Sequence, residues 1–346
     1  MALPTGTPAY SVYVGIDIAA RSASVAMLSS GLTRLDQLDI EQSPASYADL
    51  QSHLQTLKVP FETILVVMEN TGTYWMPLAR FLHQAGCAVS VVNPLAAKHF
   101  FRFDLKRDKN DRLDAFNLAE LGALLHRKLR LWYEPPPIYE ELRQRLAQRD
   151  GLTAMKTIQL QQRHALQGRP WLVPSVKARR DQLLTYLNGE LRALDREIEQ
   201  LLLQDSAWGA SARRLMSIKG IGLMTASWLL VATVNFTTCD SVEQIASYVG
   251  LVPRQNQSGD KESRRHIGYS GHPRLRHLLY LAAVTALRYN PPIKRYYERL
   301  IREGKPGKVA VIACARKLLG IAWACVKYER MFDPDYHTPP QVTPPA

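Results

Sequence analysis

Residues 13–40 read YVGIDIAARSASVAMLSSGLTRLDQLDI and decide the fold of the first part of the chain. Within this stretch, apolar runs at 13–18, 24–28 and 35–40 alternate with short segments rich in alanine, serine and glycine. Short apolar runs bounded by such residues are typical of β-strands joined by tight turns. The chain therefore opens with three successive predicted strands.

The residues that follow alternate between helical and strand patterns. Ser46 suits a helix N-cap, and the fully apolar run at 63–68 is typical of a buried central strand. The remaining predictions are helices at 46–57 and 74–84, a strand at 88–92, and helices at 96–103 and 111–125. This order predicts an α/β domain over 11–133, preceded by a disordered tail at 1–10.

A proline cluster at 135–137 ends this pattern, and long helices follow it. The clearest helix has apolar residues alternately three and four apart: Leu184, Leu187, Leu191, Leu194, Ile198 and Leu201. Such a heptad seam is buried either by an antiparallel helix of the same chain, for which 139–166 is the weaker candidate, or by a second chain. We therefore predict a helical, coiled-coil segment over 134–205, and its partner stays open.

Positive charge is concentrated at the C-terminal end. Of the 44 lysine and arginine residues, 20 lie in 206–346, together with 9 of the 31 acidic residues. Polyanions bind such surfaces by releasing counterions; a solvated basic surface kept for solubility is the alternative. Apolar helices are expected at 275–289 and 308–328. We predict a basic, mostly α-helical domain over 206–331 and a disordered proline-rich tail at 332–346.

Composition argues against a membrane protein and against a disulfide framework. The longest apolar stretch, around 222–234, is shorter than the roughly 20 residues that cross a bilayer, and the start MALPTGTPAY lacks a signal-peptide pattern. The four cysteines are widely spaced and form no CxxC pair. We expect a cytoplasmic protein with no membrane partner, whose thiols are reduced and mostly buried.

Four acidic residues lie where strands end and a helix begins. Asp17 and Glu69 follow apolar strands, while Asp111 and Asp114 share one face of a helix start. Four converging carboxylates repel by roughly 4 kcal/mol per close pair at an effective dielectric of 20, so a cation is expected. Oxygen-only ligands favour Mg²⁺ or Mn²⁺. Taken singly, Asp111 suits a helix N-cap, Asp17 a turn and Glu69 a cap of the neighbouring helix.

Two motifs stand out in the basic domain. SIKGIG at 217–222 places a Gly-x-Gly turn before an apolar helix, which is typical of a helix-hairpin-helix contact with phosphate or of tight packing between core helices. The polar loop at 251–277 holds Ser258 before a glycine, among many basic residues. An exposed serine hydroxyl with basic neighbours is suited to attack a phosphodiester. On composition alone, Ser263 and Ser270 are equally suitable.

Four short motifs in the α/β domain resemble one known family. They are GID at 15–17, ENTGTY at 69–74, VVNP at 91–94 and KNDRLDA at 109–115. Together they are similar to the N-terminal domain of the insertion-sequence-110 family of transposases, which includes the pilin-gene invertases. The resemblance implies a RuvC-like domain with the ribonuclease-H-like fold. It also implies that Asp17, Glu69, Asp111 and Asp114 form a DEDD metal site, with Ser258 as a nucleophile that becomes linked to cleaved DNA.

The resemblance extends from about residue 13 to 328 and implies partners. These are donor and target DNA, a structured noncoding RNA that pairs with both, and further copies of the chain in a homo-oligomer, all at the bacterial nucleoid. The basic residues that we expect to contact nucleic acid are Lys109, Lys219, Arg254, Lys261, Arg264, Arg265, Arg274 and Arg276.

Several alternatives stay open at this point. The protein sequence barely distinguishes a transposase from a site-specific DNA invertase of the same family. A RuvC-like junction-resolving nuclease would use the same acids with water alone as the nucleophile. The GID motif is also similar to actin-like sugar kinases, but Ile18 and Ala19 stand where those enzymes usually have glycine and threonine. A catalytically silent nucleic-acid-binding protein is the alternative from another class.

Overall fold

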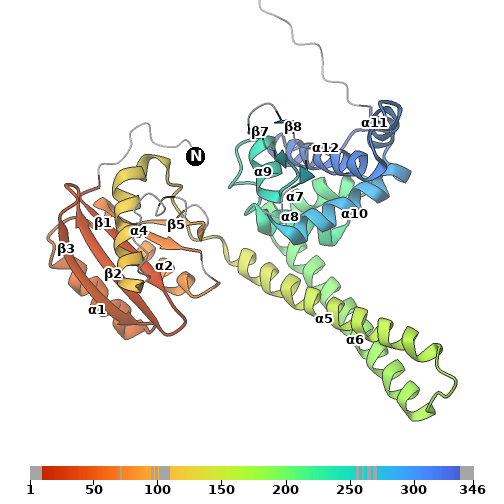
Figure 1. Cartoon of the computed structure of the whole chain (residues 1–346), viewed down its shortest axis with the longest axis horizontal. Helices are drawn as coiled ribbons and strands as arrows, with labels where there is room; N and C mark the ends of the chain where they lie inside the picture. Colours follow the sequence, from red (N-terminus) through yellow and green to blue (C-terminus); the bar gives the residue numbers. More distant parts are fainter. Residues whose placement is uncertain are drawn as a thin grey trace, which may run out of the picture. The chain divides into compact units, whose positions relative to one another are not determined.

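A computed structural model of the chain describes residues 10–70, 72–94, 97, 100, 110–254, 257–258, 261–262, 266–267 and 271–335. For the short strands between 253 and 267 the description is of the backbone. The chain forms two compact units, Met1–Glu134 and Pro135–Ala346, each with its own core (Figure 1). Most of each expected tail lies outside the described residues, as do most of the helix expected at 96–103 and Lys109, Arg264 and Arg265.

The first unit is built on a five-stranded mixed sheet. Its strands are β1 (Val12–Ile18), β2 (Ser22–Ser29), β3 (Arg34–Glu41), β4 (Ile64–Glu69) and β5 (Ala88–Val92). They lie in the order β3-β2-β1-β4-β5. The first three strands pair antiparallel, as their short turns require, whereas β1-β4 and β4-β5 pair parallel across helical connections. All five predicted strands are therefore present.

Helices cover both faces of this sheet. On one face, Val14 and Ile16 of β1 pack with α1 (Pro44–Gln55) and α2 (Trp75–Gln84). On the other face, Tyr13 packs with α4 (Asp111–Leu125), which crosses in front of the strands in Figure 1. Alternate residues of a strand point to opposite faces, so odd-numbered residues of β1 face α4.

One helix start differs from the prediction. The first helix begins at Pro44, and its N-cap is Ser43, whose hydroxyl oxygen accepts from the Ser46 amide at 3.2 Å. Proline at the first helical position fits because its missing N–H would have had no helical partner. Ser46 therefore lies within the first turn and is not the cap.

The second unit begins with a pair of antiparallel helices, α5 (Pro137–Gln167) and α6 (Pro174–Gln204) (Figure 1). Leu184, Leu187, Leu191 and Ile198 of the predicted seam are buried, and Arg149 of α5 pairs with Asp195 of α6. From Leu184 to Ile198, the heptad seam is therefore covered by a helix of the same chain, α5. The helix α5 ends at Gln167, and Gly168 is its C-cap.

The rest of this unit is a helical bundle with a large apolar core. Its helices are α7 (Ser206–Ser217), α8 (Leu223–Ala232), α9 (Val242–Val249), α10 (Pro273–Tyr289), α11 (Pro291–Arg302) and α12 (Gly307–Lys327). Among the described helices, α12 alone is long and apolar enough to cross a bilayer, and it exceeds the stretch around 222–234 that the sequence singled out. It contacts α7, α9, α10 and α11, which is typical of a central core helix.

The SIKGIG turn joins α7 to α8 and packs against α10. Gly220 has φ +113°, and a Cβ at this position would lie 2.7 Å from the Ala282 carbonyl oxygen. The Asn290 side-chain amide donates to the Lys219 carbonyl at 3.2 Å. This geometry matches the packing interpretation of the first glycine, because a larger residue would push α10 away. Gly222 has open space around its Cβ position.

Candidate metal and strand-cleavage site

Two of the four acids lie at the same edge of the sheet and on the same face. Asp17 and Glu69 each come one position after Ile16 and Met68, the last residues through which β1 and β4 pair with each other. Asp17 shares its face with Gly15 and Tyr13, and Glu69 shares its face with residues 65 and 67. Both carboxylates, which are half-buried, therefore lie on the side of the sheet that α4 covers.

The register of α4 against β1 brings the other two acids to the same end. A Cβ on Gly15 would lie 2.0 Å from the Ala115 carbonyl oxygen, and a Cβ on Gly122 would lie 3.5 Å from Tyr13 Cδ1. The helix therefore runs antiparallel to β1. Two strand residues and four helix residues both advance by about 6 to 7 Å, so the turn before Ala115 is level with the strand position two residues beyond Gly15. That turn holds Asp111 and Asp114, and that strand position is Asp17.

The close approach at Gly15 predicts a large effect of one methyl group. Gly15→Ala is expected to lower the free energy of unfolding by roughly 1–3 kcal/mol, because the methyl would overlap the α4 backbone. Gly31→Ala is the matched control, since its Cβ would meet only Ser29 Oγ, at 3.8 Å. Urea denaturation of the two variants measures the difference. Equal urea midpoints for the two variants would show that α4 does not pack closely against Gly15.

The first turn of α4 is capped by Asn110. Its side-chain oxygen accepts from the Arg112 amide at 3.1 Å. The single-residue interpretation of Asp111 as the N-cap is therefore wrong, and Asp111 is the first helical residue. Asp111 is exposed and Asp114 is half-buried. Both charges suit the positive end of the helix dipole, which stabilises them before any metal binds.

An ion pair that the sequence did not reveal ties this turn to the sheet. The Arg112 guanidinium donates to Asp39 of β3 through Nε at 3.0 Å and through Nη2 at 2.5 Å. Ser24 Oγ donates to the other Asp39 oxygen at 2.7 Å, and Ser24 is the cross-strand neighbour of Asp17. The Arg112 guanidinium, with Ser24, holds the pKa of the Asp39 carboxyl below its usual range. Asp39 is thus a fifth carboxylate on this face, neutralised within the protein.

We expect Arg112 and Asp39 to act as a unit. Arg112→Gln and Asp39→Asn should each leave the free energy of unfolding almost unchanged, because the pair is largely exposed and screened by solvent. Each should also reduce the metal-dependent catalysis expected of the four acids, since the turn bearing Asp111 and Asp114 loses its anchor on β3. A double-mutant cycle on both quantities tests this, and additive effects on activity would show that the two residues act independently.

Three of the four acids interact with other groups of the protein. Asp17, Glu69 and Asp114 each take part in an interaction with other protein groups. Among the described residues, no three His, Cys, Asp or Glu side chains stand close enough to hold a metal ion together. The strands and the helix therefore bring the four residues to one end of the sheet, while their carboxylates do not form a ligand cluster. The donor set, four carboxylates, fits a hard divalent cation such as Mg²⁺.

The serine-bearing loop contains two short antiparallel strand pairs, which the sequence did not predict. Residues Pro253–Arg254 (β6) pair with His266–Ile267 (β9), and Gln257–Ser258 (β7) pair with Lys261–Glu262 (β8). Ser258 is the last residue of β7, and its backbone partner is Lys261. The competing serines, Ser263 and Ser270, lie outside the described residues. Backbone pairing therefore puts Ser258 beside the two-residue connection of a hairpin.

The end of this loop is anchored on α9 and α10. A Cβ on Gly271 would lie 2.7 Å from the Gly250 nitrogen, and the His272 amide donates to the Tyr248 carbonyl at 3.0 Å. The His272 ring caps α10, because its Nδ1 accepts from the Leu275 amide at 3.2 Å. Burial lowers the pKa of His272. Neutral imidazole is the form that can accept this hydrogen bond.

This cap predicts a pH dependence of stability. The pKa of His272 is lowered in the folded chain, so its contribution is complete above the unfolded value of about 6.5 and is lost as the pH falls through the folded value. His272→Asn should keep the cap and flatten this part of the stability curve. Thermal unfolding of both proteins between pH 5 and about pH 8 measures it. Stability curves that run parallel for the two proteins over this pH range would contradict the role of His272 as a pH-dependent cap.

Three of the expected basic contact residues have described side chains. Lys219 is exposed, and Arg276 is half-buried and interacts with other protein groups. Arg274 of α10 pairs with Asp150 of α5. This pair joins the helical hairpin to the bundle, so Arg274 already has an internal partner. Arg254 and Lys261 lie on β6 and β8.

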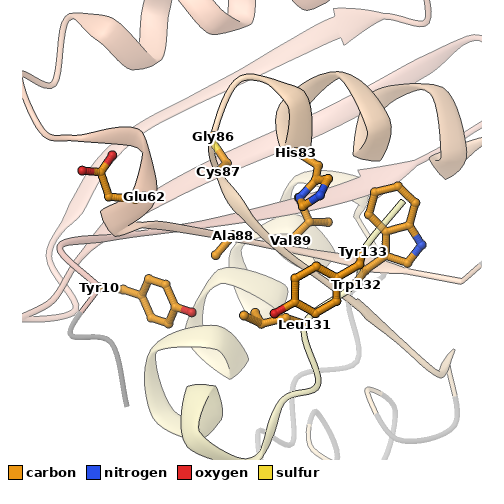
Figure 2. Close-up of a pocket in the computed structure, with 10 residues that line it drawn as sticks. All are labelled: Tyr10, Glu62, His83, Gly86, Cys87, Ala88, Val89, Leu131, Trp132 and Tyr133. Carbon is orange, nitrogen blue, oxygen red and sulfur yellow. The ribbon is translucent and has the colours of Figure 1, made fainter. Parts of the chain in front are cut away.

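A separate hollow lies in the first unit (Figure 2). It has a volume of about 300 Å³ and is lined mainly by apolar and aromatic groups, among them Tyr10, His83, Trp132 and Tyr133. Glu62 and Ala88 also line it; one precedes β4 and the other begins β5. The hollow is therefore near the amino ends of the parallel strands, whereas Asp17 and Glu69 are at the carboxyl ends. It is distinct from the acidic site.

Comparisons with known proteins point to one family. Residues 14–167 match a family described as "Transposase", and residues 212–298 match "Transposase IS116/IS110/IS902 family". A pilin gene-inverting protein of Moraxella bovis is 30% identical over 335 residues, which cover 94% of this chain and 98% of the relative. The transposase for insertion sequence element IS1111A of Coxiella burnetii is 26% identical, over 77% of this chain and 79% of the relative. A probable family 20 transposase of Pseudomonas aeruginosa is 27% identical, over 78% and 86%.

Proposed function

The chain belongs to the IS116/IS110/IS902 family of transposases, and we propose that it cuts and exchanges DNA strands of a bacterial insertion sequence with a metal-bearing acidic site and a serine nucleophile. The observation that carries the proposal is the shared position of Asp17, Glu69, Asp111 and Asp114 at one end of the sheet. A binding protein without catalytic function has no need of four carboxylates there.

We assign the first unit to the RuvC-like branch of the ribonuclease-H-like fold. Three antiparallel strands followed by two parallel ones, with a helix across the face that bears the acids, support this assignment. In the proposal Asp17, Glu69, Asp111 and Asp114 hold Mg²⁺ or Mn²⁺. When bound, the ion supplies a positive charge that stabilises negative charge developing on a phosphodiester.

Ser258 is proposed as the nucleophile. Its hydroxyl oxygen forms a bond to phosphorus while one ester P–O bond of the DNA breaks, and the serine proton ends on the departing DNA oxygen. A hydroxyl end of another strand then attacks the phosphoserine, which restores the serine and joins the new strands. The position of Ser258 in a loop rich in arginine, lysine and histidine supports this role, because basic neighbours can hold a phosphodiester for attack.

A structured noncoding RNA and further copies of the chain are the proposed partners. Exposed apolar residues gather on the half of the α5–α6 hairpin around its connection, and they support self-association. They are Met155, Ile158, Leu160, Trp171, Leu172, Val173, Val176, Leu183 and Tyr186. Light scattering of the purified protein tests this: Leu183→Glu with Tyr186→Glu should reduce the measured mass, and an unchanged mass would remove the hairpin as the contact.

Reconstitution tests the proposed function as a whole. The purified protein is incubated with Mg²⁺, DNA carrying the element junction, target DNA and RNA transcribed from the element end. We expect joined junctions only when the RNA is present. RNA-independent inversion between two DNA sites would favour the invertase, in line with the name of the Moraxella relative. Cleavage of branched DNA without joining would favour a junction-resolving nuclease.

A further inference from the structure

The helices α11 and α12 form a second cationic surface, away in sequence from the serine-bearing loop. Residues 288–317 contain nine lysine or arginine residues and two acidic ones, Glu298 and Glu303. None of the basic residues expected from the sequence to contact nucleic acid belongs to this segment. Its charge is therefore unexplained by the proposed cleavage site.

The cations of this surface lie close together. Arg295, Arg299 and Arg302 share one face of α11 at spacings of four and three, and the buried Ile293 and Leu300 lie on another face. Two cationic side chains lie over the Tyr296 ring. Arg299 Cζ is 5.2 Å and Lys317 Nζ of α12 is 4.6 Å from the ring centroid. These two cations therefore lie within about 10 Å of each other.

Little negative charge opposes them. Arg299 has Glu303 at 3.5 Å, whereas Arg295, Arg302, Lys305 and Lys308 make no ion pair with any residue in the part of the chain that the structure describes. The α5–α6 hairpin differs, because several of its arginines are paired with carboxylates of α5 or α6. A cluster of exposed like charges without counter-charges is the electrostatic pattern of a surface that binds a polyanion.

We propose that the α11–α12 surface, defined as Arg295, Arg299, Arg302, Lys305, Lys308 and Lys317, binds the phosphate backbone of duplex DNA without reading its sequence. Arg295 and Arg302 are seven helical residues apart, about 10 Å, which is close to the rise of three base pairs. Cations along such a length meet several phosphates. The inference rests on the proposed function only in taking DNA as the substrate.

The experiment measures binding without cleavage. Duplex DNA of unrelated sequence, labelled with a fluorophore, is titrated with the full chain in EDTA at several salt concentrations. The triple variant R295Q/R299Q/R302Q is compared with R163Q/R179Q/R192Q, which removes three exposed arginines from the hairpin. Each lost phosphate contact lowers the slope of log K against log salt by about 0.9, so the first variant should lose about 2 to 3 and the control almost none.

Two further arms make the result decisive. K305Q/K308Q changes only the exposed Lys305 before α12 and the exposed Lys308 in its first turn, so it remains informative if the triple variant does not fold, and its slope should fall by about 1 to 2. A structured RNA of equal length is titrated in parallel. An unchanged slope for duplex DNA, or a loss confined to the RNA, would overturn the proposal. Because EDTA prevents metal-dependent cleavage, failure here leaves the roles of Asp17 and Ser258 untouched.

Discussion

Asp17→Asn is expected to abolish strand exchange, with a loss of about 10³-fold or more. The residue lies at the end of β1, on the face that α4 covers, level with the turn that holds Asp111 and Asp114. Loss of one metal ligand removes several kcal/mol of charge stabilisation, and each 1.36 kcal/mol corresponds to about tenfold in rate. Junction formation on plasmid substrates in Mg²⁺ measures the effect.

The matched control is Asp49→Asn, which makes the same chemical change on an exposed turn of α1. It should leave the rate unchanged. A second readout separates metal binding from folding: Mg²⁺ at about 100 times its dissociation constant should stabilise the wild-type chain by about 2.7 kcal/mol, and the Asp17 variant by far less. Full activity of Asp17→Asn, or an equal Mg²⁺ effect on both proteins, would remove the four acids as a metal site.

The first unit was the most predictable part of the fold. Each of its strands is a short apolar run with turn residues on both sides, and all five were found with errors of one or two residues at their ends. The helix starts depend on subtler signals. At α1, serine occurs at both 43 and 46, and only the proline at 44 distinguishes them. At α12, the apolar helix predicted at 308–328 is found at Gly307–Lys327, although Arg316 and Lys317 interrupt its apolar pattern.

The candidate site was predictable where it depends on chain order and unpredictable where it depends on tertiary contact. Asp17 and Glu69 follow apolar runs, so their place at strand ends could be read directly. The pair formed by Asp39 and Arg112 joins residues 73 positions apart, which no local pattern reveals. The one feature of the local sequence that relates to this pair is Arg112 itself, which lies between the two aspartates of KNDRLDA. The Asn110 cap could also be predicted from the sequence, because asparagine is a common N-cap residue.

Ser258→Ala is expected to abolish both strand exchange and the covalent protein–DNA adduct. Without the hydroxyl there is no oxygen to bond to phosphorus, so the loss should reach about 10³-fold or more, as for removal of other catalytic nucleophiles. The adduct is measured by denaturing electrophoresis of labelled DNA after incubation in Mg²⁺. Ser263→Ala and Ser270→Ala, in the same loop, are the controls and should retain both signals.

The combination of variants separates the mechanisms. If Ser258→Ala keeps full activity while Asp17→Asn loses it, water is the nucleophile and the protein acts as a metal-dependent nuclease on the acids alone. If the adduct moves to Ser263 or Ser270, the serine assignment is wrong while the serine mechanism stands. Only loss of the adduct in Ser258→Ala, with retention in both controls, agrees with a nucleophile on the β7–β8 hairpin. A wild-type adduct that forms in Mg²⁺ and not in EDTA would then tie the serine step to the acids of the first unit.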